Sequence, residues 1–363
     1  MAVVVKNFEK FSISLFLKRN IKLLIHKSVP NLFIKWLMKK NYTQLGFEIT
    51  NACNANCSFC AYRFMKRKLK IIETDKIEKI VKEYSKQGGG TINFTPVVGD
   101  PLVDKELLKK IKICKSYKNI NDIFLYTNGL FLNKFNNEEL INSGLTRISI
   151  STYIGNAKGY KKYYGSHRYR QVMDNIKNIL QINKKYGNPV NIQLHLRVDL
   201  PLDRLKKNRD LNFFKKYLDP KSITWLEVYE HWSGLIKEKD IPKGAVLSKT
   251  SSYEEKRKSP CFEMYRRAHI LSNGSVGVCS CRDIEGEIVI GDVNKSSLEN
   301  IWNGKKLEKY RNDWANSMPK VCMNCDRYKP VDDFISQYGY SIISTHVRRL
   351  KRKIFSNNLN SVN

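Results

Sequence analysis

Short apolar runs alternate with longer amphipathic stretches through the central part of the chain. Six runs have the length and β-branched content of buried strands, at residues 44–50, 91–95, 122–127, 146–151, 190–198 and 223–229. Between them, apolar residues recur at helical spacing over residues 74–87, 104–117, 136–143, 168–186 and 207–218. Strands that alternate with helices predict an α/β fold with a parallel sheet, which right-handed crossovers curl into a barrel. Six such units fit an open, partial (β/α)6 barrel better than the complete form.

The same pattern divides the chain into five parts. They are a basic amphipathic segment at 1–43, the barrel at 44–234, a polar linker at 235–260, a small α+β domain at 261–330 and a basic tail at 331–363. In the small domain we expect short strands at AHILS, SVGVC and EIVIG, followed by a helix over SLENIWNGKKLEKYRNDW.

The segment 9–40 mixes large apolar residues with Lys and Arg in a loosely helical pattern that Pro30 interrupts. Cations break every apolar run and no small-residue cleavage site follows, so a signal peptide is not indicated. Packing of these helices against the main domain is the interpretation we favour. The alternative is an anionic membrane surface with Phe33 and Trp36 inward, and the basic segment 346–355 has the same two interpretations. We therefore expect a cytoplasmic protein, with peripheral association at the inner face of the membrane as the alternative.

The composition limits which classes of protein the chain can belong to. The 363 residues are 42% hydrophobic, which is enough for a sizeable core, and no apolar run reaches the roughly 18–20 residues of a membrane span. Lys and Arg total 65 against 34 Asp and Glu, a formal charge of +31. That excess favours an anionic partner such as nucleic acid, a phosphorylated substrate or an acidic membrane, but a solvated surface explains it equally well.

The segments that follow the predicted strands are rich in cysteine, glycine and polar residues. In order they read NACNANCSFC, PVVGDP, NGL, TYIG, DLP and EHWSG. Because the chemistry of parallel β/α barrels lies at the carboxyl ends of the strands, the sequence predicts an active site here.

Cys53, Cys57 and Cys60 form a C-x3-C-x2-C pattern directly after the first strand. A structural zinc site takes four ligands, and a disulfide framework does not suit a chain without a secretion signal. Iron–sulfur clusters also take four ligands as a rule, so three thiolates on a four-iron cluster leave one iron open.

With Phe59 directly before the last cysteine, this pattern resembles the signature of the radical S-adenosylmethionine (SAM) enzymes. The resemblance implies a 4Fe-4S cluster on the three cysteines, with S-adenosylmethionine chelated by the open iron. It also implies reductive cleavage to a 5′-deoxyadenosyl radical that abstracts hydrogen from a substrate, and a reducing electron donor such as flavodoxin or ferredoxin.

Further positions fit the family. Gly99, Asp100 and Pro101 resemble its GGEP-type motif, although Val98 replaces the first glycine and Asp100 the glutamate. The resemblance implies that this motif contacts the methionyl amino group of SAM. Polar contacts to the methionyl carboxylate and ribose are implied for Asn128, Ser149 and Ser151.

A second group of cysteines lies in the small domain. Cys261, Cys279, Cys322 and Cys325, with IGDVNKSSLENIW between them, resemble the SPASM and shorter twitch domains of this superfamily. The resemblance implies a second 4Fe-4S cluster on these four, with Cys281 as a spare or an alternative to Cys279. A four-cysteine zinc site is the alternative. Cys114 lies in a helical pattern and is expected to be a buried small hydrophobe.

The resemblance predicts radical chemistry without naming a substrate. Relatives dehydrogenate, epimerise or crosslink sugars, alcohols and peptides. The basic charge favours oxidation or epimerisation of an anionic sugar or glycan intermediate, and a ribosomal peptide is less favoured because about 43 residues precede the barrel. Oxidation of an alcohol radical requires a base, for which His231 and Arg197 are candidates. Other candidate substrate contacts are Tyr153, His195, Glu230 and Trp232, with His195 on the same strand face as Arg197.

Two other functions stay open. One is a zinc-stabilised protein that binds nucleic acid through its basic stretches, and the other is an RNA-modifying radical enzyme. Nucleic acid is not the partner we favour.

Overall fold

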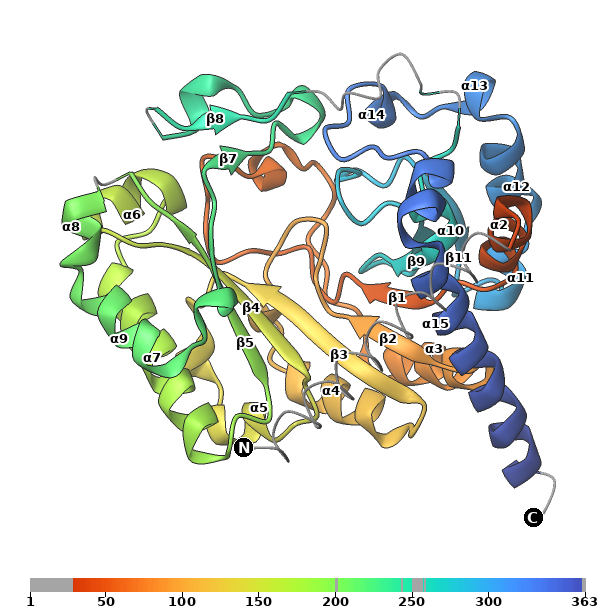
Figure 1. Cartoon of the computed structure of the whole chain (residues 1–363), viewed down its shortest axis with the longest axis horizontal. Coiled ribbons are helices and arrows are strands. Elements are labelled where there is room, and N and C mark those ends of the chain that lie inside the picture. Colours follow the sequence, from red (N-terminus) through yellow and green to blue (C-terminus); the bar gives the residue numbers. More distant parts are fainter. Residues whose placement is uncertain (1–28, 200–201, 243, 250–256, 258, 361–363) are drawn as a thin grey trace, which may run out of the picture.

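The computed structural model describes residues 29–199, 202–242, 244–249, 257 and 259–360. The predicted strands form a parallel sheet in chain order (Figure 1). They are β1 (Gln44–Phe47), β2 (Gly90–Asn93), β3 (Ile120–Thr127), β4 (Arg147–Tyr153), β5 (Asn191–Arg197) and β6 (Ile223–Trp225). The open, partial β/α barrel expected from the sequence is confirmed.

Helices connect the strands and bury one face of the sheet. They are α3 (Thr74–Lys86), α4 (Leu107–Ser116), α5 (Asn137–Ile141), α6 (Ala157–Tyr164), α7 (Tyr169–Lys185), α8 (Leu202–Lys206) and α9 (Arg209–Tyr217). The burial of β5 alternates, with Ile192, Leu194 and Leu196 buried against the helices. His195 and Arg197 therefore share the opposite, less buried face, as a period of two requires.

The sixth apolar run splits into two short strands. After β6, the chain continues as β7 (Val228–Tyr229), which pairs with β8 (Val246–Leu247) in a separate small sheet. β6 is the edge strand on its side of the main sheet, and Trp225 at its end is 36% exposed. Few neighbouring residues therefore pack on this end of the strand. The segment after β7 reaches the carboxyl-terminal unit, where the His231 amide donates a hydrogen bond to Asp326 at 3.1 Å.

The carboxyl-terminal unit extends the barrel sheet. Its strands β9 (Arg267–Ile270), β10 (Ser275–Gly277) and β11 (Val289–Asp292) are added at β1, and β9 runs parallel to β1. In the described part of the chain this gives one sheet of nine strands, in the order β11-β10-β9-β1-β2-β3-β4-β5-β6. Figure 1 shows the cyan and blue unit directly beside β1. The two domains therefore share a sheet.

Short helices complete this unit: α10 (Glu263–Arg266), α11 (Leu298–Trp302), α12 (Lys305–Asn312), α13 (Trp314–Ser317) and α14 (Lys320–Met323). The single helix expected over residues 297–314 was wrong, because the chain leaves helical geometry at Gly304, which has extended backbone angles. The η turns Ala61–Phe64, Pro101–Val103, Leu132–Lys134, Pro220–Ser222, Trp232–Gly234 and Glu238–Asp240 lie in the connecting loops.

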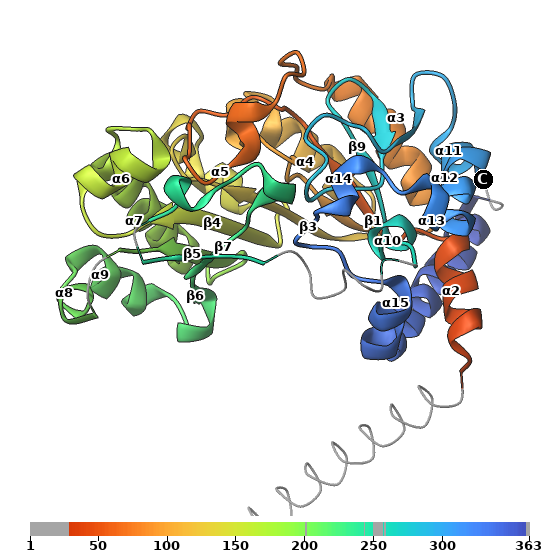
Figure 2. The ribbon, with the colours of Figure 1, turned by 90° about the horizontal axis from the view of Figure 1, so that it is seen from above.

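Two terminal helices pack against each other, α2 (Asn31–Lys40) and α15 (Val331–Asn360), as Figures 1 and 2 show from two directions. α2 begins after Pro30, buries Ile34, Leu37 and Met38, and leaves Phe33 and Trp36 about half exposed. This part of the segment 9–40 packs on the protein, and residues 9–28 lie outside the described residues. Of the helices that the structure describes, none combines the length and apolar character needed to cross a bilayer.

The described parts of segment 235–260 also pack against the rest of the protein. Ile236 and Ile241 are buried, and Asp240 forms an ion pair with Arg63 at 2.5 Å. Ser58 donates a hydrogen bond to the carbonyl of Asp240. This segment therefore covers the loop that carries the first cysteines.

Candidate active site

The first cysteine loop leaves the carboxyl end of β1 and is fixed by backbone hydrogen bonds. The amides of Asn56 and Ser58 donate to the carbonyls of Tyr164 and Tyr163, at 3.2 and 2.9 Å. Both tyrosines lie at the end of α6, so that helix sets the path of the loop.

The three thiols of this loop are free and lie close enough to interact electrostatically. Burial raises the pKa of Cys53 to about 12 and that of Cys57 well above its usual value, and the other thiols and Asp100 act in the same direction. Such groups need a nearby cation to hold them as thiolates. Within the described ranges, no three His, Cys, Asp or Glu side chains converge tightly enough to hold one metal ion.

Asp100 ties the loop after β2 to the loop after β3. Its carboxylate accepts hydrogen bonds from the Leu102 amide, the Thr127 hydroxyl and the Asn128 amide, at 2.7 to 3.0 Å. Burial raises the pKa of Asp100 to about 6, although the hydrogen bonds from these donors act to lower it. Because its lone pairs are engaged within the protein, Asp100 positions the loops in this structure.

Gly99 lets the GDP segment approach the cysteine loop. Its φ of +123° lies in a region that glycine adopts without strain and other residues rarely adopt. An added Cβ would also lie 2.9 Å from the carbonyl oxygen of Thr50. The Asp100 amide then donates to the Ala52 carbonyl at 2.9 Å, and Pro101 is buried. A glycine is therefore required where the sequence motif has one.

Asn128 contacts the cysteine loop directly. Its Nδ2 atom lies 2.6 Å from Oδ1 of Asn54 and 3.9 Å from the Cys53 sulfur. Its backbone is held by Asp100, so the loops after β1, β2 and β3 meet at this point. The structure thus brings together residues from three predicted strand ends.

Arg197, at the end of β5, lies over the ring of Phe59 with its guanidinium carbon 4.1 Å from the ring centroid. It donates to Ser151 at 2.6 Å and to the Tyr164 hydroxyl at 3.3 Å. Burial alone would lower the pKa of Arg197, but Tyr164, Tyr229 and Cys57 raise it. The side chain therefore keeps its positive charge beside the thiols.

Other predicted residues lie farther along the barrel or face elsewhere. Ser149 is buried and donates to Gln193 at 3.3 Å. His195 stacks on Tyr126, and burial lowers its pKa. Tyr153 is buried, and its hydroxyl donates a hydrogen bond to the Asp199 carboxylate at 2.5 Å. Among the described residues, none of these three side chains forms a hydrogen bond or a ring contact with the cysteine loop.

Trp232 faces the cysteine loop from the segment after β7. It packs on a small buried cluster of Ala61, Val97, Val98 and Ile284, which Cys60 also contacts. Because Ile284 belongs to the carboxyl-terminal unit, Trp232 lies where the barrel and that unit meet.

A charged network lies beside Trp232. Arg282 is over its ring at 4.7 Å and forms ion pairs with Asp326 at 2.6 Å and Glu230 at 3.2 Å. Arg327 binds the other oxygen of Glu230 at 2.6 Å. Burial raises the pKa of Cys60, and the charge of Arg282 acts in the opposite direction. Arg282 also acts on Cys281 and Cys325, so it lies between the two groups of cysteines.

His231 is buried at the base of this network. Its Nδ1 accepts the Gly234 amide at 2.8 Å, which places the proton of the neutral ring on Nε2. Nε2 has no hydrogen-bond partner among the described residues. In this tautomer the free nitrogen is a donor.

The second group of thiols gathers in the carboxyl-terminal unit. Burial raises the pKa of Cys322 well above its usual value, and Cys279, Cys261 and Cys325 raise it further. The amides of Arg282 and Arg327 donate to the sulfurs of Cys279 and Cys325, both at 3.4 Å. Backbone donors of this kind suit thiolate ligands.

Two other cysteines differ from these. Burial raises the pKa of Cys281, and Glu263 raises it further while Arg267, Arg282 and Arg327 lower it. Cys281 in turn raises the pKa of Cys279 and Cys325, so it lies beside the second group of thiols. Cys114 is fully buried in α4, as expected for a core residue.

Sequence reasoning missed several residues of this site. Tyr163 and Tyr164 belong to an aromatic segment after β4, YKKYYG, whose density of tyrosine was the available signal. Arg282 and Asp326 directly follow cysteines, and that position beside candidate ligands was the other signal.

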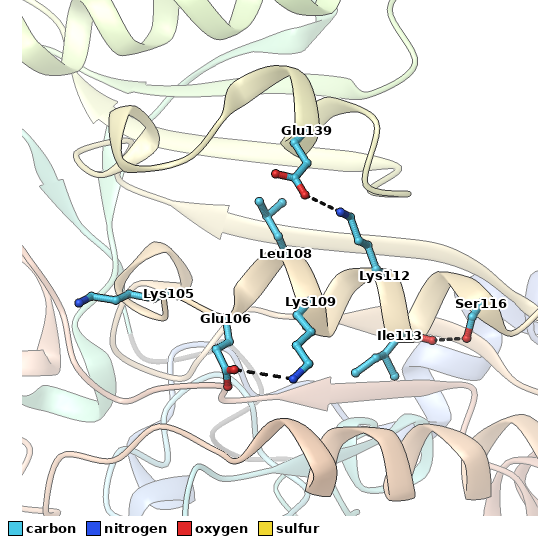
Figure 3. Close-up of a pocket in the computed structure, with 8 residues that line it drawn as sticks. All are labelled: Lys105, Glu106, Leu108, Lys109, Lys112, Ile113, Ser116 and Glu139. Atoms are coloured by element: carbon cyan, nitrogen blue, oxygen red, sulfur yellow. Dashed lines mark hydrogen bonds and ion pairs between the residues drawn. The ribbon is translucent and has the colours of Figure 1, made fainter.

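A pocket of about 620 Å³ lies on the outer side of α4 (Figure 3). Four of its charged groups form two ion pairs, Glu106 with Lys109 and Glu139 with Lys112. None of its lining residues belongs to the set around the thiols, so we do not assign it to the site.

Two family models match this chain, and each match spans one of the two groups of cysteines. Residues 47–195 match the model of the radical SAM superfamily, and residues 261–326 match that of the SPASM iron–sulfur cluster-binding domain. The first match contains Cys53, Cys57 and Cys60, and the second contains all five cysteines of the carboxyl-terminal unit.

Similar curated proteins include GTP 3′,8-cyclases. That of Alkaliphilus metalliredigens (strain QYMF) is 30% identical over 152 residues, which is 41% of this chain and 47% of the relative. That of Clostridium botulinum (strain Hall) is 28% identical over 287 residues, 77% of this chain and 86% of the relative. In the first two such relatives, the match spans less than half of the relative's length.

Solved structures share the fold. SuiB of Streptococcus suis bound to precursor peptide SuiA has a TM-score of 0.54 and 13% identity, covering 81% of this chain and 73% of that one. BtrN in complex with AdoMet and 2-DOIA has a TM-score of 0.50 and 17% identity, covering 79% and 93%. At these identities the likeness establishes the architecture alone.

Proposed function

This chain belongs to the radical SAM superfamily and carries a carboxyl-terminal SPASM domain, and from that premise we propose that it abstracts hydrogen from an anionic, sugar-bearing substrate. The cofactors of such enzymes, two iron–sulfur clusters and S-adenosylmethionine here, supply an electron and a 5′-deoxyadenosyl radical when bound. The observation that carries the proposal is the set of three thiols after β1, within the residues that match the superfamily.

Cys53, Cys57 and Cys60 would hold the first cluster. Three partly buried thiols, with no fourth metal-ligating side chain gathered with them in the described part of the chain, suit a centre that keeps one iron for SAM. A reductant is required, and a flavodoxin or ferredoxin is the donor class we propose. Cys261, Cys279, Cys322 and Cys325 would hold the second cluster, with all its irons ligated by protein.

The chain's own side chains supply binding and orientation around the first cluster. Arg197 retains a positive charge next to the thiols and is the group we assign to an anionic part of SAM, in place of the base role considered for it. Asn128, fixed by Asp100, offers an amide next to Cys53. Phe59 and Tyr164 hold Arg197 in its place.

The substrate would lie between the two groups of cysteines, beside Trp232, Glu230 and Arg282. Arg282 acts on thiols of both groups, so this region faces both centres. Glu230 presents carboxylate oxygens that can accept a proton, whereas the free ring nitrogen of His231 carries a proton in the observed tautomer.

The substrate class rests on charge and on the relatives. A formal charge of +31 favours a phosphate-bearing substrate. The curated relatives are named for GTP, which contains both a sugar and phosphates. Oxidation or epimerisation of a nucleotide-linked or lipid-linked sugar fits these features.

The test uses anaerobically reconstituted protein and measures 5′-deoxyadenosine. We expect the reduced protein to cleave SAM and Cys57→Ala to lose that activity, while Cys114→Ala retains it because Cys114 lies in the core away from the thiols. Nucleotide sugars should then stimulate cleavage more than short peptides. Colourless protein with stoichiometric zinc would overturn the radical assignment, and stimulation by peptides alone would overturn the substrate class.

A further inference from the structure

A second cavity lies at the amino ends of the strands, opposite the end that carries the thiols. Its volume is about 180 Å³. One side is formed by residues that begin β1, β2 and β3, among them Thr43, Gly90 and Asp122. The other side is formed by Arg348, Arg349 and Arg352 of α15.

Glycine allows α15 to come this close to the sheet. Gly88, which precedes β2, has a φ of +99°, and an added Cβ would lie 2.7 Å from the Arg349 carbonyl. Arg349 donates to the Gln87 carbonyl at 2.9 Å and lies over the rings of Tyr42 and Tyr84. These contacts hold the basic turn of α15 over the strand ends.

The charges of this cavity are unbalanced. Among the described residues, no carboxylate forms an ion pair with Arg348, Arg349 or Arg352. Asp122 is the one carboxylate in the lining, and it accepts the Thr146 hydroxyl at 2.5 Å. Three guanidinium groups therefore face one carboxylate that is already engaged.

Arg349 is the most constrained of the three. Arg349 is only 3% exposed, yet its Nη1 atom has no hydrogen-bond partner in the described part of the chain. A buried cationic donor without a partner costs free energy, which a bound anion offsets. The imbalance thus points to an anionic ligand.

We propose that this cavity binds the phosphate group of a ligand, independently of the radical chemistry. Guanidinium groups match phosphate oxygens with paired N–H donors, and α15 offers three of them. Since a water occupies about 30 Å³ in the liquid, the cavity admits a group of several heavy atoms. The phosphate belongs either to a soluble ester or to a lipid headgroup, and the exposed Val347 and Leu350 lie on the same turn of α15.

The test measures binding of inorganic phosphate to the full chain by calorimetry. The variant is Arg348→Gln with Arg352→Gln, which leaves Arg349 and its packing on Tyr42 in place. Lys351→Gln is the matched control, because Lys351 is exposed on the same helix and does not line the cavity. We expect the double variant to weaken binding at least about tenfold and the control to change it less than about twofold.

Vesicles distinguish the two sources of phosphate. If phosphatidylcholine vesicles bind only when they contain phosphatidic acid, and the double variant alone loses this binding, the ligand is a lipid headgroup. Binding of inorganic phosphate without binding of such vesicles assigns a soluble ester. The proposal is overturned if the wild-type chain binds neither, or if Lys351→Gln loses as much affinity as the double variant, which indicates bulk charge only.

Discussion

Arg282 and Asp326 form a buried, two-point ion pair, with Nε 2.6 Å from Oδ1 and Nη2 3.0 Å from Oδ2. Their side chains are 3% and 1% exposed. Each residue directly follows a cysteine of the carboxyl-terminal unit. Asp326 also accepts the Ser248 hydroxyl and the His231 amide, so the pair connects that unit to the segment after β7.

Replacement of Asp326 by Asn should destabilise the protein strongly. Burial alone would raise the pKa of Asp326, but the hydrogen bond and charge of Arg282 lower it to about 2, so the carboxylate is charged at neutral pH. Its loss leaves Arg282 buried with only the more exposed Glu230 as counter-charge, and breaking such a pair costs about 3–5 kcal/mol. Thermal unfolding of the cluster-loaded protein measures this.

The neighbouring arginine provides the control for that experiment. Arg327 is 62% exposed in its pair with Glu230, so Arg327→Gln should cost less than about 1 kcal/mol. Equal losses in Asp326→Asn and Arg327→Gln would contradict the assignment of a buried, structural pair.

Arg197→Lys should raise the KM for SAM at least about tenfold. A lysine keeps the charge but cannot span Ser151 and the Tyr164 hydroxyl while lying flat over Phe59. The SAM dependence of 5′-deoxyadenosine formation gives this value. His195→Asn serves as the control on the same strand face and should change KM less than about threefold. An unchanged KM in Arg197→Lys would remove this residue from the SAM site.

Iron content should separate the cysteines of the carboxyl-terminal unit. With two four-iron clusters, the wild-type chain should hold about eight irons, and Cys322→Ser should hold about four. Cys281→Ser should stay near eight, because Cys279 is the member of this neighbouring pair that we assign as a ligand, although Cys281 lies close enough to raise the pKa of Cys279. A fall to about four in Cys281→Ser would make Cys281 a ligand, and zinc in place of iron would exclude the second cluster.

The barrel and the cysteine loop could be predicted from the sequence because they depend on local patterns. Strand and helix periodicity follow from burial, and Cys53, Cys57 and Cys60 are close along the chain. The convergence of Asp100 and Asn128 on this loop also followed from their places at parallel strand ends.

Contacts between distant segments could not be predicted. The pairing of β9 with β1 joins residues more than 200 positions apart, and nothing in either short run specifies the other. The same holds for Arg282 with Glu230 and for the approach of α15 to Gly88. Each depends on how whole units pack, which the pattern of a single segment does not contain.

The packing of β9 on β1 also determines the surroundings of His269, which lies on β9. It pairs with Gly46 of β1, where an added Cβ would lie 2.4 Å from its Nδ1. The side chain is 0% exposed, and neither ring nitrogen has a hydrogen-bond partner among the described residues. Burial, with the positive charges of Arg267 and Arg67, lowers the pKa of His269 to about 3.

This histidine should make the protein less stable as the pH falls below neutral. His269 stays neutral in the folded chain, whereas in the unfolded chain it binds a proton below about pH 6.5. Its contribution to stability is therefore complete above pH 6.5 and declines below it, by about 1.4 kcal/mol at pH 5.5. The pKa values of His195 and His346 are lowered by burial too, so their contributions have the same sign.

The measurement compares melting temperatures at pH 7.5 and 5.5 for three proteins, so that any constant effect of a substitution cancels. The wild-type chain should lose several degrees between the two values, and His269→Gln should lose less because one buried titration has been removed. His167→Gln is the control: its imidazole is exposed and meets solvent in both states, so the wild-type pH dependence should persist. If the melting temperature of His269→Gln falls as much as that of the wild-type chain, the surroundings of His269 do not hold it neutral. The packing of β9 on β1 at Gly46 would then be looser than in this structure.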